Sequence, residues 1–522
     1  MTALHEWAAR QGSKPALIDA GTGTVIDYAT LDRRSRLAAR WLIDAGLQEG
    51  DGVALLLDND LRMIELCWGA RRAGLYFTAV NHHLTLPEVT HVLTDCGARW
   101  VVACEATRPL AAQALAEPAL ASVQAVLLDG PADDRFDVYE EALARQSDGP
   151  LPERAQGRDM LYSSGTTGFP KGIRRPLRSL AQKRLPDPEV QAWQRAFGFD
   201  DTTVYLSTAP FYHAAPLRYV MRVIETGGTA VSMARFDAQA ALAAIDRHAV
   251  THSQWVPTMF VRLLALPPEV RARASLATMR VAIHAAAPCP PHVKQAMLDW
   301  WGDIVHEFYG GSEGLGLTAI GPAEWRAHPG SVGRATLGVL HIVDDDGHEL
   351  APGEVGRIYF SGAASFAYHN DPEKTAAAYN DRGWATYGDL GHVDEDGYLY
   401  LSDRRVDLIL CGGVNIYPQE IENVLSRQAD VADVAVVGVD DDEFGQVVCA
   451  VVQVKEGVVG DAALAARLVQ ACRSSLGRLK LPRYVVFEEA LPRLPTGKML
   501  RRILKERYRR AGGQPGVFTI KP

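Results

Sequence analysis

Residues 161–172, Leu-Tyr-Ser-Ser-Gly-Thr-Thr-Gly-Phe-Pro-Lys-Gly, gather two serines, two threonines, three glycines and a lysine. Glycines let the backbone approach a ligand closely, and hydroxyls, N–H groups and a lysine can surround phosphate oxygens. The usual P-loop requires Gly-Lys-Ser/Thr, whereas Phe169 and Pro170 separate Gly168 from Lys171 here. Gly-Thr-Thr-Gly alone is as consistent with a polar surface turn, but the flanking serines and Pro-Lys-Gly favour a phosphate-binding loop.

Residues 306–314, His-Glu-Phe-Tyr-Gly-Gly-Ser-Glu-Gly, form a second group that could do chemistry. The Tyr309 ring can cover a purine, and the Ser312 hydroxyl can bond an α-phosphate. Glu313 is a hard oxygen ligand of the kind Mg²⁺ prefers. Further on, the Asp389 carboxylate could accept from both hydroxyls of a ribose, although an ordinary surface residue is the alternative. A Tyr-Gly-Gly turn is weak evidence alone, but it gains weight downstream of a phosphate-binding loop.

An aromatic-walled pocket is predicted where a strand-like run ends in Pro210-Phe211-Tyr212-His213. A lone histidine such as His213 is more often structural than functional. Trp255 and Met259 follow another strand and could line the same pocket, although each is individually more typical of a core.

The composition sets the broad class of the protein. At 522 residues, with 47% hydrophobic and 22% charged residues, the chain predicts a globular protein of two or more domains. A net charge of −9 argues against a nucleic-acid partner. The seven cysteines form no Cys-x-x-Cys pair, and neither a signal pattern nor a transmembrane run is visible. We therefore expect a cytoplasmic protein; whether it forms a homodimer is left open.

Strand-like and helical segments alternate along the chain. Residues 53–57 read as a buried parallel strand between helices at 30–45 and 61–73, which predicts right-handed βαβ units. Short strands near 353–362 predict a small β-rich subdomain. The expected fold is therefore α/β: a large N-terminal domain of α/β subdomains plus that β-rich subdomain, then a small mobile α+β C-terminal domain. Our expected boundaries are 1–406 and 407–522.

Three further features are interpreted, from the residues alone, as ordinary surface or loop structure. The arginines and lysines of residues 173–187 are expected to form a solvated basic face, as are those of residues 501–510. Asn59, after the first strand, is expected to be a turn residue. Residues 412–418, Gly-Gly-Val-Asn-Ile-Tyr-Pro, are expected to be a glycine loop that opens a helix.

These segments, from about residue 25 to Arg502, resemble the AMP-forming acyl-CoA synthetases of the acyl-adenylate-forming superfamily, which includes adenylation domains and luciferase. Ser312 replaces a family threonine, His284 and Ala285 replace the usual Ser-Gly, and Asp403 replaces a glycine. The resemblance implies two steps: a carboxylate attacks ATP to give acyl-AMP and pyrophosphate, and a thiol then displaces AMP. ATP, Mg²⁺ and CoA are the implied cofactors, and a small-molecule carboxylic acid is the implied partner.

The resemblance also implies a role for each matching residue. Lys498, Glu313 and Thr166 are the implied catalytic residues, with Lys498 reaching the carboxylate and α-phosphate, and Glu313 and Thr166 at the metal. The implied nucleotide-binding residues are Ser163, Ser164, Gly165, Thr166, Thr167, Gly168, Lys171, Ala286, Tyr309, Gly310, Ser312, Asp389 and Arg404. The implied substrate-binding residues are His213, Trp255, Ala285 and Gly311; Gly412 and Gly413 would face CoA, and Asp407 would be the hinge.

The identity of the acid is the weakest inference. Amino-acid-activating relatives carry an aspartate that holds the α-amine, and residues 210–215 here contain no carboxylate. We therefore expect a hydrophobic acid: fatty, aromatic or cyclic. Two alternatives to a CoA ligase stay open, namely acyl transfer to a carrier-protein thiol and a non-catalytic nucleotide-binding protein.

Overall fold

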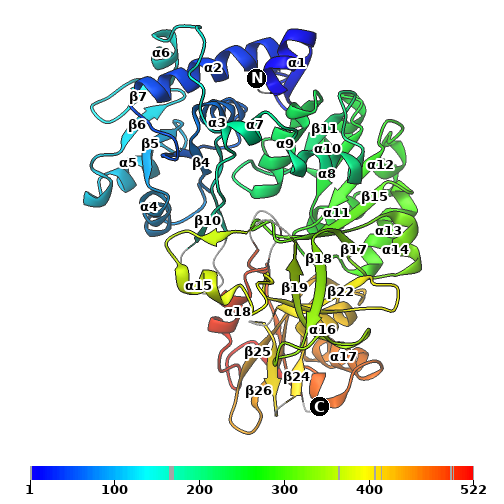
Figure 1. Cartoon of the computed structure of the whole chain (residues 1–522). Helices are drawn as coiled ribbons and strands as arrows, with labels where there is room; N and C mark the ends of the chain where they lie inside the picture. The colour runs from blue at the N-terminus through cyan, green and yellow to red at the C-terminus, as the bar shows by residue number, and fades with distance from the viewer. Residues whose placement is uncertain are drawn as a thin grey trace.

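The structure is a computed structural model that describes residues 3–163, 170–362, 365–404, 407–412, 414–493, 497 and 499–520. Figure 1 shows two large α/β layers side by side at the top, a β-rich region below them, and the C-terminal unit at the bottom. The fold class predicted from the sequence is confirmed. Among the described helices, none combines the length and apolarity that crossing a bilayer requires.

The first layer is a parallel sheet of six strands in the order β7-β6-β5-β3-β4-β8. Its strands are β3 (Gly52–Leu56), β4 (Tyr76–Ala79), β5 (Ala98–Ala103), β6 (Gln124–Leu127), β7 (Asp137–Val138) and β8 (Arg158–Asp159). The associated helical segments are α1 (Ala3–Gln11), α2 (Tyr28–Asp44), α3 (Arg62–Ala73), α4 (Leu86–Asp95), α5 (Arg108–Leu115), the 3₁₀ turn η1 (Pro118–Leu120) and α6 (Tyr139–Ala144). Every residue of β3 is buried, as expected for a central parallel strand.

Close helix packing in this layer depends on one glycine. A Cβ at Gly69 of α3 would lie 2.7 Å from the Ala38 Cβ of α2. The small residues at both positions therefore allow the two helix backbones to approach. On the sheet side of α2, Trp41 meets Trp100 of β5 edge to face, with ring centroids 4.9 Å apart.

The second layer is a nine-stranded sheet in the order β17-β16-β15-β14-β13-β11-β12-β1-β2. Its strands are β1 (Pro15–Asp19), β2 (Val25–Asp27), β11 (Val204–Ser207), β12 (Thr229–Ser232), β13 (His252–Trp255), β14 (Val281–His284), β15 (Val305–Tyr309), β16 (Leu317–Ile320) and β17 (Arg334–Leu337). The helices around it are α7 (Leu180–Lys183), α8 (Pro188–Phe197), α9 (Ala214–Glu225), α10 (Ala238–Arg247), α11 (Pro257–Leu264), α12 (Pro268–Arg273), α13 (Pro291–Trp301) and α14 (Pro322–Ala327).

Four neighbouring strands of this sheet, β15, β14, β13 and β11, run parallel. Their carboxyl ends therefore meet at one edge of the sheet, where open α/β folds bind ligands. The segments that follow these strands include the sequence-predicted residues His213, Ala285, Ala286 and residues 310–313. The sheet thus brings together motifs separated by about a hundred residues.

Two small sheets lie next to that edge. An antiparallel four-stranded sheet contains β18 (Val339–Val343), β19 (Gly356–Ser361), β21 (Asp389–Val393) and β22 (Leu399–Arg404). A three-stranded sheet contains β9 (Leu161–Ser163), β10 (Lys171–Arg174) and β20 (Ala367–Tyr368), followed by α15 (Pro372–Ala377). Strands β9 and β10 pair Ser163 with Lys171, so they hold both ends of the predicted phosphate-binding loop. Residues 164–169 of that loop lie outside the described residues.

The C-terminal unit has its own sheet and its own hydrophobic core, formed by residues between Ile409 and Ala511. Its elements are β23 (Ile409–Cys411), β24 (Val414–Ile416), α16 (Pro418–Leu425), β25 (Val431–Asp441), β26 (Gly445–Val454), α17 (Ala462–Arg473), the 3₁₀ turn η2 (Arg478–Lys480), β27 (Tyr484–Phe487), α18 (Arg501–Arg507) and β28 (Val517–Thr519). The boundary at 406/407 stays a prediction.

The glycine loop at 412–413 differs from the expectation. Cys411 pairs with Val414, so Gly412 lies in the turn between β23 and β24, and strand β24 precedes helix α16. Gly412 has a φ of +57°, the left-handed conformation that glycine adopts without strain. The expectation that this loop opens a helix directly was therefore wrong by one short strand.

Candidate active site

A cavity of about 2040 Å³ opens at the carboxyl edge of the nine-stranded sheet, bordered by the β-rich region and the C-terminal unit. Of the residues assigned from the sequence, the following line it: His213, Trp255, Ala285, Ala286, Tyr309, Gly310, Gly311, Ser312, Glu313, Asp389 and Asp407. Six separate segments of the chain thus contribute to one space, although the role of each residue stays a prediction.

The remaining assigned residues fall into three groups. Lys171 lies beside Asp371, with its Nζ 3.4 Å from the carboxylate, and Gly412 lies in its hairpin turn next to Phe444. The following lie wholly outside the described residues: Ser164, Gly165, Thr166, Thr167, Gly168, Gly413 and Lys498. For Ser163 and Arg404 only the strand position is described, with Arg404 of β22 directly opposite Asp389 of β21.

A tyrosine and an aspartate join the nine-stranded sheet to the four-stranded one. The Tyr309 hydroxyl, at the end of β15, donates to Asp389 Oδ2 over 2.6 Å. Asp389 is 8% exposed, so its carboxylate faces the cavity from a largely buried position. The Tyr309 ring, which could cover a purine, therefore lies beside the Asp389 carboxylate, which could accept hydrogen bonds from a ribose.

Glu313 is positioned by a tyrosine and by a glycine. Its Oε1 accepts from the Tyr368 hydroxyl over 3.0 Å. A Cβ at Gly311 would lie 2.6 Å from Glu313 Oε2 and 2.4 Å from a ring carbon of Tyr387. Residue 311 must therefore be glycine for this carboxylate and ring to keep their places. An oxygen ligand held in this way suits a divalent cation such as Mg²⁺.

Two lysines lie close together near Glu313. Lys374 of α15 lines the cavity, and its Nζ lies 4.7 Å from the centre of the Tyr368 ring. Burial, together with the neighbouring Lys171, lowers the pKa of Lys374 to about 8. Two ammonium groups held this close repel each other, and an anion placed between them would relieve that repulsion.

His213 begins helix α9 as its N-cap residue and is neutral at physiological pH. Burial, with a smaller effect of His83, lowers the pKa of His213 to about 3. Its buried Nε2 has no hydrogen-bond partner among the described residues, and His213 is one of the residues that line the cavity. Asn59 fixes the turn that precedes His213. Its side-chain oxygen accepts from the Phe211 N–H, and its side-chain nitrogen donates to the Met233 carbonyl. Asn59 is thus structural, as expected.

The segment after β14 contains one strained residue. Ala286 lines the cavity with a φ of +75°, which an L-residue adopts at a cost of about 1–2 kcal/mol. Beneath it, His284 is fully buried and Glu307 forms a buried ion pair with Lys294 over 2.5 Å. The backbone strain thus falls on Ala286, one residue beyond the Ser-to-His and Gly-to-Ala changes noted in the sequence.

The C-terminal unit reaches the cavity through Gly497. A Cβ at this position would lie 2.4 Å from Thr258 Oγ1, at the start of α11. Gly497 also has a φ of +78°. Gly497 is therefore packed against Thr258, at the carboxyl edge of the nine-stranded sheet.

Asp407 is held by two cations of the terminal helix α18. Its carboxylate lies 3.2 Å from Lys505 Nζ and 3.8 Å from Arg501 Nη1, and Arg501 also donates to Glu422 over 2.7 Å. The expectation of a solvated basic face was wrong for these two residues, because each meets a carboxylate.

The expectation for residues 173–187 was also wrong in part. Arg175 is 7% exposed and lies between Asp159 and Glu189, at 3.5 and 2.8 Å, and Arg178 pairs with Asp187. Arg174 and Arg184 do lie at the surface, as expected.

Sequence reasoning missed several residues that line the cavity: Arg218, Tyr368, Lys374 and Tyr387. Tyr387 directly precedes the Gly388-Asp389 motif, and Arg218 follows Ala214 by one helical turn, so spacing could have flagged both. Tyr368 and Lys374 reach the site because β20 pairs with β10, a contact between positions nearly two hundred residues apart. Local spacing holds no signal for such a pairing.

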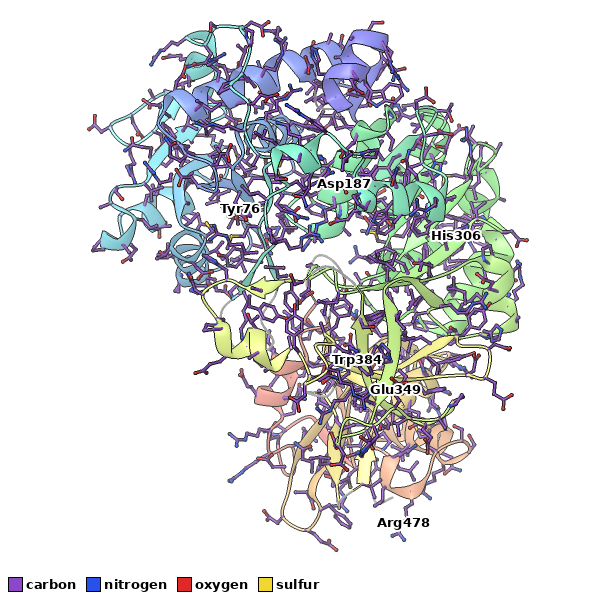
Figure 2. The ribbon with its side chains drawn as sticks, in the orientation of Figure 1. Tyr76, Asp187, His306, Glu349, Trp384 and Arg478 are labelled. Atoms are coloured by element: carbon purple, nitrogen blue, oxygen red, sulfur yellow. The ribbon has the colours of Figure 1, made fainter. Side chains whose placement is uncertain are left out.

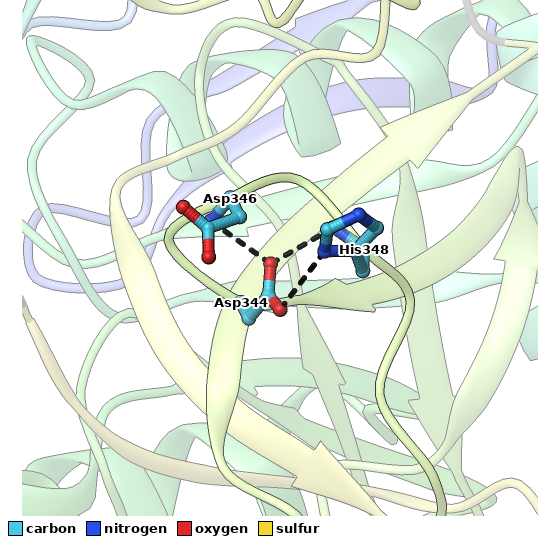
Figure 3. A group of neighbouring side chains, drawn as sticks. All are labelled: Asp344, Asp346 and His348. Atoms are coloured by element: carbon cyan, nitrogen blue, oxygen red, sulfur yellow. Dashed lines mark hydrogen bonds and ion pairs between the residues drawn. The ribbon is translucent and has the colours of Figure 1, made fainter.

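A cluster of Asp344, Asp346 and His348 lies outside the cavity, on the turn after β18 (Figure 3). Asp344 Oδ1 accepts from the backbone N–H groups of the other two residues, over 2.9 and 2.8 Å. Asp346 and His348 are exposed. The hydrogen bonds of the turn account for this grouping without a metal.

The fold is that of an adenylate-forming enzyme. Models of the AMP-binding enzyme family and of its C-terminal domain match residues 4–368 and 420–498. The chain therefore belongs to the AMP-binding enzyme family, and the resemblance and the enzyme class predicted from the sequence, an acid–thiol ligase, are confirmed.

Relatives match over nearly the whole chain. A long-chain-fatty-acid–CoA ligase of Mycobacterium tuberculosis is 30% identical over 94% of this chain and 95% of its own length. An indoleacetate–CoA ligase of Aromatoleum aromaticum is 32% identical over 91% of each chain. Among solved structures, ATP-bound MatB from Rhodopseudomonas palustris superposes with a TM-score of 0.82, at 29% identity, over 98% of this chain and 100% of that one.

We predict that Gly497→Ala impairs adenylation selectively. The added methyl group would collide with Thr258 and would strain the backbone at this positive φ. Acid-dependent pyrophosphate release should fall at least about tenfold, the equivalent of about 1.4 kcal/mol. Thioester formation from supplied acyl-AMP should change little. Adding Thr258→Ala should restore part of the loss, and Thr258→Ala alone is the control; equal losses in both half-reactions would contradict this seating.

We predict that Lys374 makes ATP use dependent on pH. Because the pKa of Lys374 is lowered to about 8, the free enzyme loses this charge as pH rises through that value. If Lys374 helps to bind phosphate, kcat/KM for ATP should decline above about pH 8. Lys374→Gln should lower kcat/KM about tenfold at neutral pH, as expected for a lost charge-assisted hydrogen bond, and flatten this limb. Lys374→Arg should keep the activity without the decline, and an unchanged profile in Lys374→Gln would rule the residue out.

Proposed function

We propose that the protein is an ATP-dependent carboxylic acid–CoA ligase that forms AMP by way of an acyl-AMP intermediate. The observation that carries the proposal is that the Tyr309–Glu313 segment, Asp389 and His213 line one cavity. Thr258, against which Gly497 packs, lines the same cavity. ATP and CoA are substrates of the enzyme family to which the chain belongs. Which residues bind them, and which acid is used, are proposed from the geometry.

The first half-reaction needs no activated side-chain nucleophile, because the substrate carboxylate itself attacks the α-phosphorus of ATP. The obstacles are repulsion between anions and the in-line geometry of attack. Lys171, Thr166 and Thr167 would hold the β- and γ-phosphates. Lys498, following Gly497 on its seat, would meet the carboxylate and the α-phosphate. Fixed positive charge and donors placed where charge develops lower the barrier.

Mg²⁺ fits the residues that surround Glu313. This carboxylate is an oxygen donor held at the cavity wall by Tyr368, and we propose that Glu313 and Thr166 hold the ion. When bound, Mg²⁺ would neutralise phosphate charge. Nearby, Tyr309 would cover the adenine, Ser312 would bond the α-phosphate, and Asp389 would accept from the ribose hydroxyls.

The second half-reaction requires the carboxylate side of the site to open to a thiol. We propose that residues 407–522 rotate as a mobile domain about Asp407, a hinge transition between two discrete arrangements. The rotation would withdraw the Lys498 segment and bring the Gly412–Gly413 turn toward the pantetheine arm of CoA. The contacts of Asp407 with Lys505 and Arg501 give the hinge an anchor within the C-terminal unit.

The acid is proposed to have a hydrophobic body. The cavity wall beyond His213 contains Trp193, Tyr212, Tyr219 and Phe308, and the helix residues nearest to it, Ala214 and Ala215, are small. Such a wall suits a fatty, aromatic or cyclic acid. Relatives named for a long-chain fatty acid and for indoleacetate agree with this range.

We predict opposite effects from changes at the lysine and at the hinge. Lys498→Ala should abolish acid-dependent pyrophosphate release while thioester formation from supplied acyl-AMP survives, because only the first step uses this charge. Asp407→Pro should slow the thioester step far more than adenylate formation, since proline restricts the rotating backbone. Rapid-quench measurement of each half-reaction separates the two. Retained pyrophosphate release in Lys498→Ala would remove that residue from its role.

We predict that a panel of carboxylic acids with ATP and Mg²⁺ will give pyrophosphate, AMP and a CoA thioester, with steady turnover only when CoA is present. EDTA should stop the reaction and added Mg²⁺ should restore it. A single burst of pyrophosphate that CoA does not relieve would instead favour transfer to a carrier-protein thiol. If no acid supports turnover or a burst, the ligase proposal fails and a nucleotide-binding role without catalysis gains support.

A further inference from the structure

An arginine-rich wall lines part of the cavity and a side pocket next to it. It consists of Arg158, Arg175, Arg218 and Arg222, and the two carboxylates that they share, Asp159 and Glu189. All of these residues except Asp159 line the main cavity, and all six line a small side pocket beside it. Figure 2 labels Tyr76 and Asp187, which mark this region between the two large layers; the Tyr76 hydroxyl donates to the Arg175 carbonyl.

The charges of this wall do not balance. Burial alone would raise the pKa of Glu189, but the surrounding arginines hold it down at about 2. Arg218 and Arg175 likewise hold the pKa of Asp159 below its usual range, against the effect of burial. Both carboxylates are therefore ionised. Four guanidinium groups share two carboxylates, which leaves an excess of two positive charges.

Neighbouring ionisable groups do not supply the missing negative charge. Arg71 forms a bidentate pair with Glu225, and Arg178 pairs with Asp187, so these groups balance one another. On the reaction side the next carboxylate is Glu313, which the proposed function assigns to Mg²⁺. Buried charge that is left uncompensated is costly, and protein interiors normally pair it.

Several donors of the wall have capacity to spare. Arg222 makes one recorded hydrogen bond, from Nη2 to Glu189 over 3.2 Å, although a guanidinium carries five N–H donors. Among the described residues, Arg175, 7% exposed, has no partner for its Nε. The Tyr219 hydroxyl also has no partner among them, and Tyr219, 2% exposed, is one of the residues that line the cavity.

Helix α9 sets the distance between this wall and the reaction centre. Ala214, Arg218 and Arg222 follow at intervals of four residues, so they share one face of the helix. With a rise of 1.5 Å per residue, Arg218 lies about 6 Å and Arg222 about 12 Å beyond Ala214. Arg218 also donates to the Ser312 carbonyl over 3.2 Å, which ties the wall to the reaction centre. Trp193, whose ring lies 4.9 Å from the Arg222 guanidinium carbon, covers the space between.

We propose that this wall binds a second carboxylate at the far end of the substrate, so that the protein ligates a dicarboxylic acid with a hydrophobic middle. The inference rests on the proposed function and narrows its acid. The distal carboxylate would accept from Arg222 and from the Tyr219 hydroxyl, offsetting part of the excess charge. The hydrophobic middle would pass the alanines and the aromatic side chains of the cavity.

The test compares each dicarboxylic acid with its own monomethyl ester. Adipic, suberic and sebacic acids are assayed beside their monomethyl esters by pyrophosphate release, and kcat/KM is measured for each. At least one diacid should exceed its ester by about tenfold or more, the effect of one charged contact. A wild-type enzyme that uses the esters as well as the diacids would overturn the inference.

Variants assign the preference to the wall. Arg222→Met, which keeps the side-chain length, should lower the diacid-to-ester ratio of kcat/KM about tenfold or more, and Arg222→Lys should keep part of it. Arg195→Met is the matched control, because Arg195 is an exposed arginine at the same cavity. Tyr219→Phe removes only the hydroxyl and should lower the ratio several-fold, so it tests the site even if Arg222→Met does not fold.

The remaining outcomes distinguish a failure of this inference from a failure of the ligase function. If Arg222→Met leaves the ratio unchanged and instead raises KM for CoA, the wall serves a CoA phosphate and the inference is wrong. If monocarboxylic acids turn over and no diacid does, the ligase function stands and only this inference falls. If no acid at all releases pyrophosphate, the ligase function and this inference fall together.

Discussion

The parallel pairing of β15, β14, β13 and β11 is the constraint on which the site depends. Parallel strands end at one edge of their sheet, so the segments that follow them must meet there whatever their separation in sequence. The histidine, the small-residue turn and the Tyr-Gly-Gly segment are therefore placed by backbone hydrogen bonds of the sheet. Their own side chains do not have to find one another.

The second constraint is how closely neighbouring side chains approach two glycines. Gly311 leaves room for Tyr387 and Glu313, and Gly497 leaves room for Thr258, with atoms that a Cβ would meet within 2.6 Å in each case. Gly311 belongs to the segment that follows β15 of the nine-stranded sheet, and Gly497 belongs to the C-terminal unit. Packing this tight favours discrete arrangements over gradual adjustment, which suits a domain that alternates between two positions.

Much of the fold could be predicted from the sequence, because its buried strands and amphipathic helices have clear periods. The strand at 53–57 and the helices at 30–45 and 61–73 were found to within a few residues. The cavity-lining residues of the Tyr309–Glu313 segment were found because several chemically capable types lie within one short run. The phosphate-binding loop and Lys498 were named on the same grounds and stay predictions, because they lie outside the described residues.

The errors about the two basic runs share one physical cause: charge was judged by local sequence alone. Arg175, Arg501 and Lys505 lie in basic runs that resemble solvated faces, yet each meets a carboxylate brought by another part of the fold, among them Asp159, Glu422 and Asp407. Burial makes the difference, because a surface arginine needs no partner whereas a buried one must be compensated. An unbalanced, partly buried cluster on a cavity wall is thus informative in a way that a basic run is not. Two carboxylates compensate four guanidinium groups only in part, and a bound carboxylate is a simple group that could offset part of the remaining charge.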